Sequence, residues 1–228
     1  MTLFETLRTI HISAGAVAFI VAPIAMIVKK GGQAHRTWGK VFFWAMATIG
    51  STAVIMAPMH GNQFLMILGV FSFYLAFKGY RSVFRKKVWK TKKTAFIDWF
   101  FAILNTVFSL GLLILGFKNL PEAFGIIAIV FGGLGTWLGL KDIREFLNPT
   151  NDPKAWFFSH MIGMITAYIA AVSAFSAVNM HFLPTVLQWL WPTLIGSPLL
   201  TIWIRSYKEK FSKGKKIREL VEVSGEIE

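Results

Sequence analysis

The sequence contains no cysteine among its 228 residues. Disulfide bonds, thiolate metal sites, iron–sulfur clusters and cysteine nucleophiles are therefore excluded, and any metal must be bound by histidine, methionine or oxygen. Acidic residues are also scarce, since 11 aspartates and glutamates stand against 24 lysines and arginines, for a formal net charge of +13. No HExxH, GxSxG, Walker or dinucleotide-binding glycine motif occurs, so the sequence leaves open whether the protein is an enzyme.

What the sequence has in abundance is hydrophobic residues, at 55% of the chain, which is more than one soluble core requires. A transmembrane helix needs about 20 mostly apolar residues. Seven runs meet this need: Ile10 to Val28, Val41 to Pro58, Phe64 to Phe77, Trp99 to Phe117, Ala123 to Leu140, Ala155 to Val178 and Phe182 to Ile204. The third is short, and we expect it to extend through Tyr80 because Lys78 and Arg81 can reach the headgroups.

The basic residues cluster in alternate connections between these runs. All of the 24 except Arg8 and Lys118 fall after spans one, three, five and seven, and the positive-inside rule makes that face cytoplasmic. The sequence thus predicts an all-α polytopic membrane protein with its N-terminus outside, a seven-helix transmembrane domain over residues 1–204 and a basic cytoplasmic tail over residues 205–228. The predicted location is the cytoplasmic (inner) membrane.

This topology also accounts for the strong positive charge. Nucleic acid is therefore not a predicted partner; the expected partners are the lipid bilayer and the anionic lipids of its inner leaflet. The sequence leaves a homo-oligomer open.

Histidine is the one residue type that offers metal or cofactor ligands in some number. At about 1.5 Å per residue, His11 lies near the outer boundary and His160 roughly 9 Å inside the inner one, so they cannot share an ion. Each is a candidate cofactor ligand, because ionisable residues within transmembrane helices are rare and usually have a functional role. The alternative for His160 is a hydrogen bond to a neighbouring helix.

Two further histidines, His60 and His181, lie in outer connections directly after Met59 and Met180. Together with His11 they form a predicted metal site on the outer side, where imidazole and thioether groups suit copper or haem iron. The alternative is that His60 and His181 are solvated loop residues.

Asp98 is the only carboxylate that the predicted spans place near a membrane interior. It lies in the first turn of span four beside Lys92 and Lys93, where the helix dipole favours negative charge. We therefore expect a structural role for Asp98, with proton transfer as the alternative.

Two of the spans carry residues that are unusual in a helix. Pro192 and Pro198 predict a kink or local unwinding in span seven, and broken helices of this kind border binding sites in some transporters. Gly135 and Gly139 lie on one face of span five and predict close helix packing.

The stretch His11-Ile-Ser-Ala-Gly15, the stretch from Lys30 to Gly39 (Lys-Gly-Gly-Gln-Ala-His-Arg-Thr-Trp-Gly) and the later His160 resemble a bacterial family of multi-pass membrane proteins catalogued only as a domain of unknown function. The resemblance covers about the first quarter of the chain. It implies no activity, and it marks five positions for testing: His11, His35, Arg36, Gly39 and His160.

The same loop after span one offers a flexible backbone beside His35, Arg36 and Lys40 at the cytoplasmic surface. These groups suit a phosphate or a lipid headgroup, and the alternative is a tight, positively charged hairpin.

Three classes of function remain open from the sequence. The first is a membrane redox or metal-handling protein with histidine-ligated haem b or copper. The others are a small-molecule transporter or carrier and a non-catalytic membrane scaffold.

Overall fold

The computed structural model describes residues 2–222, and residues 223–228 of the predicted tail lie outside the described part. Within that part the chain is helical and has no strand, which confirms the all-α prediction. The helices are α1 (Leu3–Ile27), α2 (Gln33–Met59), α3 (Gln63–Ser82), the 3₁₀ turn η1 (Val83–Arg85), α4 (Val88–Thr91), α5 (Phe96–Lys118), α6 (Ala123–Leu147), α7 (Ala155–Asn179), α8 (Thr185–Ser212) and α9 (Ile217–Leu220).

Local sequence signals set several of the helix ends. A capping box between Thr2 and Glu5 starts α1, and the Asn62 side chain accepts a hydrogen bond from the Leu65 amide at the start of α3. Gly31 and Gly61 follow α1 and α2 with φ of 75° and 63°, a left-handed conformation that suits glycine. The chain therefore reverses sharply after each of the first two helices.

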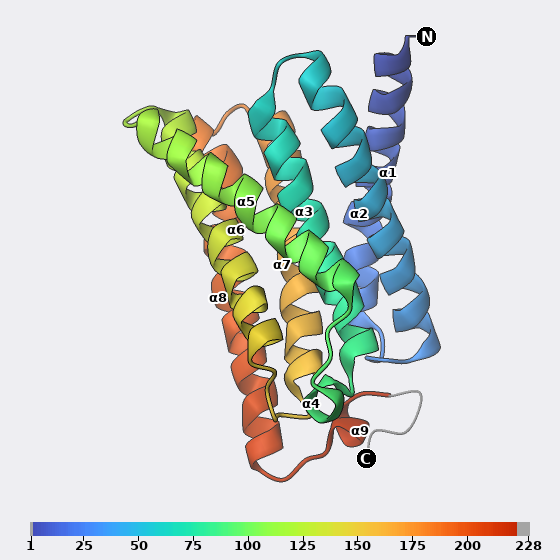
Figure 1. Ribbon diagram of the computed structural model, residues 1–228. Helices are drawn as coiled ribbons and strands as arrows, with labels where there is room; N and C mark the ends of the chain where they lie inside the picture. The colour runs from blue at the N-terminus through green and yellow to red at the C-terminus, as the bar shows by residue number, and fades with distance from the viewer. Residues whose placement is uncertain (1, 223–228) are drawn as a thin grey trace.

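The long helices run up and down side by side (Figure 1). Along the chain, α1 packs on α2, α2 on α3, α5 on α6 and α7 on α8, while α3 also contacts α5 and α7. The N-terminus and the last described residues lie at opposite ends of the bundle (Figure 1). The α1–α2 loop, η1, α4 and α9 lie at the same end as the last described residues, so the structure gathers the basic connections at one end, here named the basic end.

Six helices of the described chain are long and apolar enough to cross a membrane: α1, α2, α3 with η1, α5, α6 and α7. Large apolar side chains such as Ile103, Val107 and Trp137 are exposed on the outside of the bundle, as lipid contact requires. The protein is therefore a multi-pass membrane protein by length and composition of its helices.

The helix α8 is not among these six, although it has 28 residues. Its polar residues and the charged turns near its end lower its mean hydropathy. The sequence predicts a kink or local unwinding at Pro192 and Pro198; α8 continues as a helix through both prolines, which excludes the unwinding. It also ends at Ser212, eight residues beyond the predicted domain boundary at residue 204.

Glycine allows two pairs of helices to touch closely. Gly135 and Gly139 of α6 lie against Ser109 and Thr106 of α5, where a Cβ atom would collide, as the sequence predicted. On the other side of the bundle, a Cβ on Gly79 of α3 would lie 2.6 Å from the Met164 amide nitrogen of α7. The α3 and α7 backbones therefore meet at Gly79.

Ion pairs inside the bundle correct the prediction that Lys78 and Arg81 extend to the headgroups. The Lys78 Nζ donates to Asp142 Oδ1 at 2.6 Å, and Arg81 donates two hydrogen bonds of 3.0 Å to Asp98. Tyr74 also donates to Asp142. Both basic side chains turn inward because α5 and α6 present carboxylates at the same level.

These pairs also correct the interpretation of the carboxylates. Asp98 is not the only one at membrane depth, because Asp142 is 2% exposed; α6 continues past Leu140, where the predicted span ended. The cationic partner of Asp98 is Arg81, whereas Lys92 instead donates to Pro149, Thr150 and Asn151.

Candidate functional site

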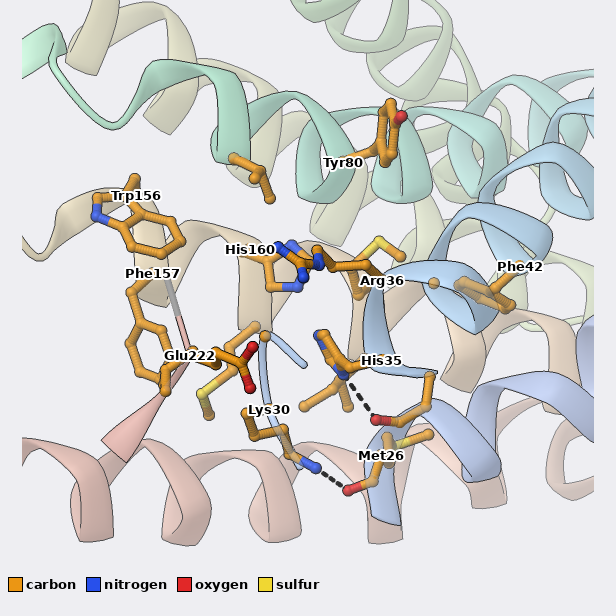
Figure 2. A pocket seen from close by; sticks show the side chains of 18 of the residues that line it. Met26, Lys30, His35, Arg36, Phe42, Tyr80, Trp156, Phe157, His160 and Glu222 are labelled. Carbon is orange, nitrogen blue, oxygen red and sulfur yellow. Dashed lines mark hydrogen bonds between the residues drawn. The ribbon is translucent and has the colours of Figure 1, made fainter. Parts of the chain in front are cut away.

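A cavity of about 220 Å³ opens at the basic end of the bundle (Figure 2). It is lined by α1, the α1–α2 loop, α2, the end of α3, α7, α8 and the segment after α9. Most of the lining is apolar or aromatic: Phe42, Tyr80, Phe84, Trp156, Phe157, Trp203 and Tyr207, with Met26, Met161 and Met164. The polar lining consists chiefly of two histidines and four cationic side chains.

The end of α1 explains how His35 is placed. The last carbonyls of a helix lack backbone partners, and here side chains supply them. His35 Nδ1 lies 2.8 Å from the Ala25 carbonyl oxygen, and Lys30 Nζ donates to the next carbonyl, that of Met26. The chain folds back from α1 into α2 so that His35 caps the helix that precedes it.

His160 is placed in the same way by the end of α3. Its Nδ1 lies 2.9 Å from the Gly79 carbonyl oxygen, which also accepts a hydrogen bond from the Ser82 hydroxyl at 2.7 Å. The close approach of α7 to Gly79 brings this carbonyl within reach of the imidazole. The structure therefore supports the alternative role foreseen for His160, a hydrogen bond to a neighbouring helix.

The two imidazoles face each other across helices α2 and α7. Their ring centroids are 6.0 Å apart, with an angle of 71° between the planes. A carbonyl oxygen only accepts hydrogen bonds, so Nδ1 carries the proton in each ring and Nε2 of a neutral ring has a free lone pair. Figure 2 shows the second nitrogen of His35 turned away from its hydrogen bond and toward the side of His160.

The cationic side chains of the lining are Lys30, Arg36, Lys40 and Lys86, and the one carboxylate among the described lining residues is Glu222. Lys30 lies over the Trp203 ring at 5.4 Å and Lys86 over the Trp156 ring at 5.1 Å.

Burial lowers the pKa of Lys30 below its ordinary value. Burial, followed by the positive charge of Arg36, lowers the pKa of Lys86. Both ammonium groups are thus partly withdrawn from water.

The segment after α9 closes one side of the cavity. The Glu222 amide donates to the Lys30 carbonyl at 2.9 Å, and the Glu222 carboxylate lies 3.3 Å from Lys29 Nζ. Val221 is buried in a cluster with Trp156, Phe157 and Phe211. The basic tail thus packs against the bundle through its last described residues.

The three histidines of the predicted outer metal site each have different surroundings. The described residues include no group of three or more His, Cys, Asp or Glu side chains that could hold a metal ion. His11 bonds to the Thr52 hydroxyl through Nδ1 at 2.8 Å, which ties α1 to α2. His60 packs edge-on against Phe4 with ring centroids 4.3 Å apart, and His181 is exposed in the α7–α8 connection.

The structure brings some of the predicted site residues together and separates others. His35, Arg36 and Lys40, predicted to form a headgroup or phosphate site, line one cavity together with His160. His11, the other predicted cofactor ligand, does not line that cavity.

Sequence reasoning missed Lys86 and the aromatic wall, because nothing in the sequence shows that η1 and α8 lie against the first hairpin. A usable signal for the histidines was the unpaired carbonyls at the ends of α1 and α3, which require nearby donors.

Comparison with known proteins found no matching family model, no similar curated protein and no similar solved structure. The function must therefore be argued from the cavity itself.

Proposed function

We propose that this protein binds an anionic amphiphile in the cavity at the basic end of its bundle, as a membrane carrier or lipid-handling protein does. The observation that carries the proposal is the composition of one cavity: four cations and one carboxylate on a lining that is otherwise mostly apolar and aromatic. Cations gathered beside apolar walls suit a ligand with a negative head and an apolar body.

The position of the cavity supports the same kind of ligand. We propose that α8 is a seventh span, that the N-terminus lies outside and that the basic end faces the cytoplasm. A helix of 28 residues is about 42 Å long, which suffices for a bilayer, and the basic connections gather at one end of the bundle. The cavity then opens at the level of the inner-leaflet headgroups, where anionic lipids are concentrated.

The size of the cavity indicates how much of the ligand it encloses. Pockets that enclose a drug-sized ligand span roughly 300–1,000 Å³, whereas this cavity holds about 220 Å³. It therefore suits a headgroup with the first part of an apolar chain, and the rest of the chain remains in the bilayer.

A lipid-binding experiment tests the proposal. Native mass spectrometry of the delipidated protein should show a bound anionic lipid at lower concentration than a zwitterionic lipid with the same acyl chains. Arg36→Gln should weaken this binding about tenfold, because a charge-assisted contact is worth roughly 1.5–3 kcal/mol. Arg144→Gln is the matched control, because Arg144 is an exposed arginine near the end of α6 that does not line the cavity.

A filling variant provides a second test of the same cavity. Gly39 lines it, and a Cβ atom at this position would meet no atom within 4 Å. Gly39→Leu should therefore fold normally and reduce anionic lipid binding. Equal binding of anionic and zwitterionic lipids by the wild-type protein, with no effect of Arg36→Gln or Gly39→Leu, would contradict the proposed function.

A second candidate is a redox or metal-handling protein with haem b or copper held by His35 and His160. Two imidazoles on one metal, each with a bond of about 2 Å, place their ring centroids about 6 Å apart, and the observed separation is 6.0 Å. Histidines that bind a metal usually donate their other ring N–H to a carbonyl or carboxylate, as Nδ1 of both rings does here. Met26 in the same cavity offers a soft thioether.

Four neighbouring positive charges disfavour a metal cation at that place, so this candidate stands second. A Soret band, or copper in equimolar amount, in the purified protein would support it. Loss of either signal in both His35→Asn and His160→Asn would assign the ligands.

A further inference from the structure

The two histidines of the cavity offer hydrogen-bond acceptors that the protein leaves unused. Nδ1 of each ring donates to a helix-terminal carbonyl, so Nε2 of the neutral ring can only accept. Among the described residues, neither Nε2 has a hydrogen-bond partner. The ligand at this place therefore needs a hydrogen-bond donor as part of its head.

The surrounding charges add a second requirement. Lys30, Arg36 and Lys40 line the same cavity and form no salt bridge among the described residues, and Glu222, the one carboxylate of the described lining, is already 3.3 Å from Lys29. A neutral hydroxyl compound would satisfy the imidazoles and leave these three cations without a counter-ion. A metal cation would be repelled by them. The head must therefore be an anion that also carries a hydrogen-bond donor.

Few biological oxyanions meet both requirements near neutral pH. A carboxylic acid has an ordinary pKa of about 4 and has lost its proton. The phosphate of a phosphodiester has no P–OH group, so a donor can come only from a hydroxyl elsewhere in the head, away from the charged oxygens. A phosphate monoester has a second pKa of about 6, so near this pH it carries negative charge and often one P–OH group together.

We propose that the head recognised in this cavity is a phosphate monoester, with its P–OH donated to Nε2 of His35 or His160. Its charged oxygens are held by Arg36, whose planar guanidinium suits bidentate phosphate contacts, and by the lysines. This assignment rests on the proposed binding of an anionic amphiphile and names the chemistry of its head.

The proposal is tested with two lipids that share acyl chains but differ in the head. Phosphatidate is a monoester, and phosphatidylmethanol is a diester whose head carries no hydrogen-bond donor; each is added to the delipidated full-length protein at pH 6. The expected result is at least tenfold tighter binding of phosphatidate. A soluble arm uses glycerol 3-phosphate: binding of this compound alone identifies a free phosphate monoester as the ligand, and its failure to bind identifies the lipid.

The variants separate the two nitrogens of each imidazole. Asparagine keeps a donor near the position of Nδ1 and removes the Nε2 acceptor, whereas glutamine keeps an acceptor near the position of Nε2. His35→Asn and His160→Asn, alone and together, should therefore reduce the preference for phosphatidate toward one, and His160→Gln should retain part of it. An unchanged unfolding temperature shows that the helix caps persist. Where a variant of one histidine unfolds at a lower temperature, the glutamine variant of the other histidine is tested instead.

The outcomes distinguish this inference from the proposed function. Equal binding of both anionic lipids, weakened by Arg36→Gln but not by the histidine variants, would overturn the phosphate-monoester assignment and leave an anion site. No binding of either lipid would overturn both. If the wild-type protein holds a metal or haem that the asparagine variants lose, the ligand of the two histidines is a cofactor and the phosphate assignment is overturned.

Discussion

The two sides of α3 treat positive charge in opposite ways. Toward α5 and α6, Lys78 and Arg81 are each paired with a carboxylate inside the bundle. Toward α2 and α7, the cavity collects Lys30, Arg36 and Lys40, which form no salt bridge among the described residues, and the Glu222 carboxylate beside them contacts Lys29. Charge that the protein neutralises itself holds helices together, whereas the charge of these three cations is what the proposed ligand would neutralise.

The largest effect is expected from breaking the neutralised side at Asp142. Asp142→Ala leaves the ammonium of Lys78 and the hydroxyl of Tyr74 buried without their acceptor, and loss of one partner of a buried pair costs about 3–5 kcal/mol. Equilibrium unfolding in detergent with increasing sodium dodecyl sulfate measures this loss.

The control for Asp142→Ala is the double variant Lys78→Met with Asp142→Leu, which removes both charges and should recover most of the stability. Binding of anionic lipid by this double variant should match that of the wild type. A single variant that loses less than about 1 kcal/mol, or a double variant without lipid binding, would show that the two sides of α3 are not separable.

An intermediate effect is expected for Asp98→Asn. The dipole of a helix N-terminus alone is worth about 0.3–1 kcal/mol, but the two hydrogen bonds from Arg81 raise the expected loss to about 1.5–3 kcal/mol. The loss stays below that of Asp142→Ala because the Arg81 side chain is 25% exposed and can be partly rehydrated. The same unfolding assay, with Lys93→Gln as the control, decides between the dipole and the ion pair.

The smallest effect is expected at the contact between the tail and the first loop. Lys29 and Glu222 are 80% and 48% exposed, and exposed pairs contribute about 0–1 kcal/mol. Lys29→Gln should therefore change the unfolding free energy by no more than about 0.5 kcal/mol. It also frees the Glu222 carboxylate to compete with the ligand for the cations of the cavity. A modest decrease in lipid affinity would support this competition. A stability loss as large as that of Asp98→Asn would place the tail among the structural contacts instead.

Much of the fold could be predicted because lipid exposure demands long apolar helices, and the charges between them repeat in alternate connections. The close packing at Gly135 and Gly139 followed from small residues spaced one turn apart. The ion pairs did not, since no local pattern shows that Asp142 of α6 and Lys78 of α3 lie at the same level and face each other. The span was ended at Leu140 because a charge is costly in lipid, and this rule does not apply to a charge with a buried partner.

The site was predicted in part for the same reason. His35, Arg36 and Lys40 are close in sequence, so one loop and one helical turn bring them together. His160 is more than a hundred residues away, and its place depends on the contact of α3 with α7. The outer metal site of His11, His60 and His181 was predicted from membrane depth alone, and depth does not determine which helices are neighbours. The His11 side chain bonds to Thr52 instead.

The hydrogen bond from the Glu222 amide to the Lys30 carbonyl has a consequence for the order of assembly. One wall of the cavity leaves the ribosome with the first hairpin, and the opposite edge follows nearly two hundred residues later. Chains fold progressively during synthesis, so the cavity stays open toward the membrane surface while the remaining helices insert. Its final shape is reached only when Val221 and Glu222 reach the first hairpin, and ligand binding thereby depends on this late segment of the chain.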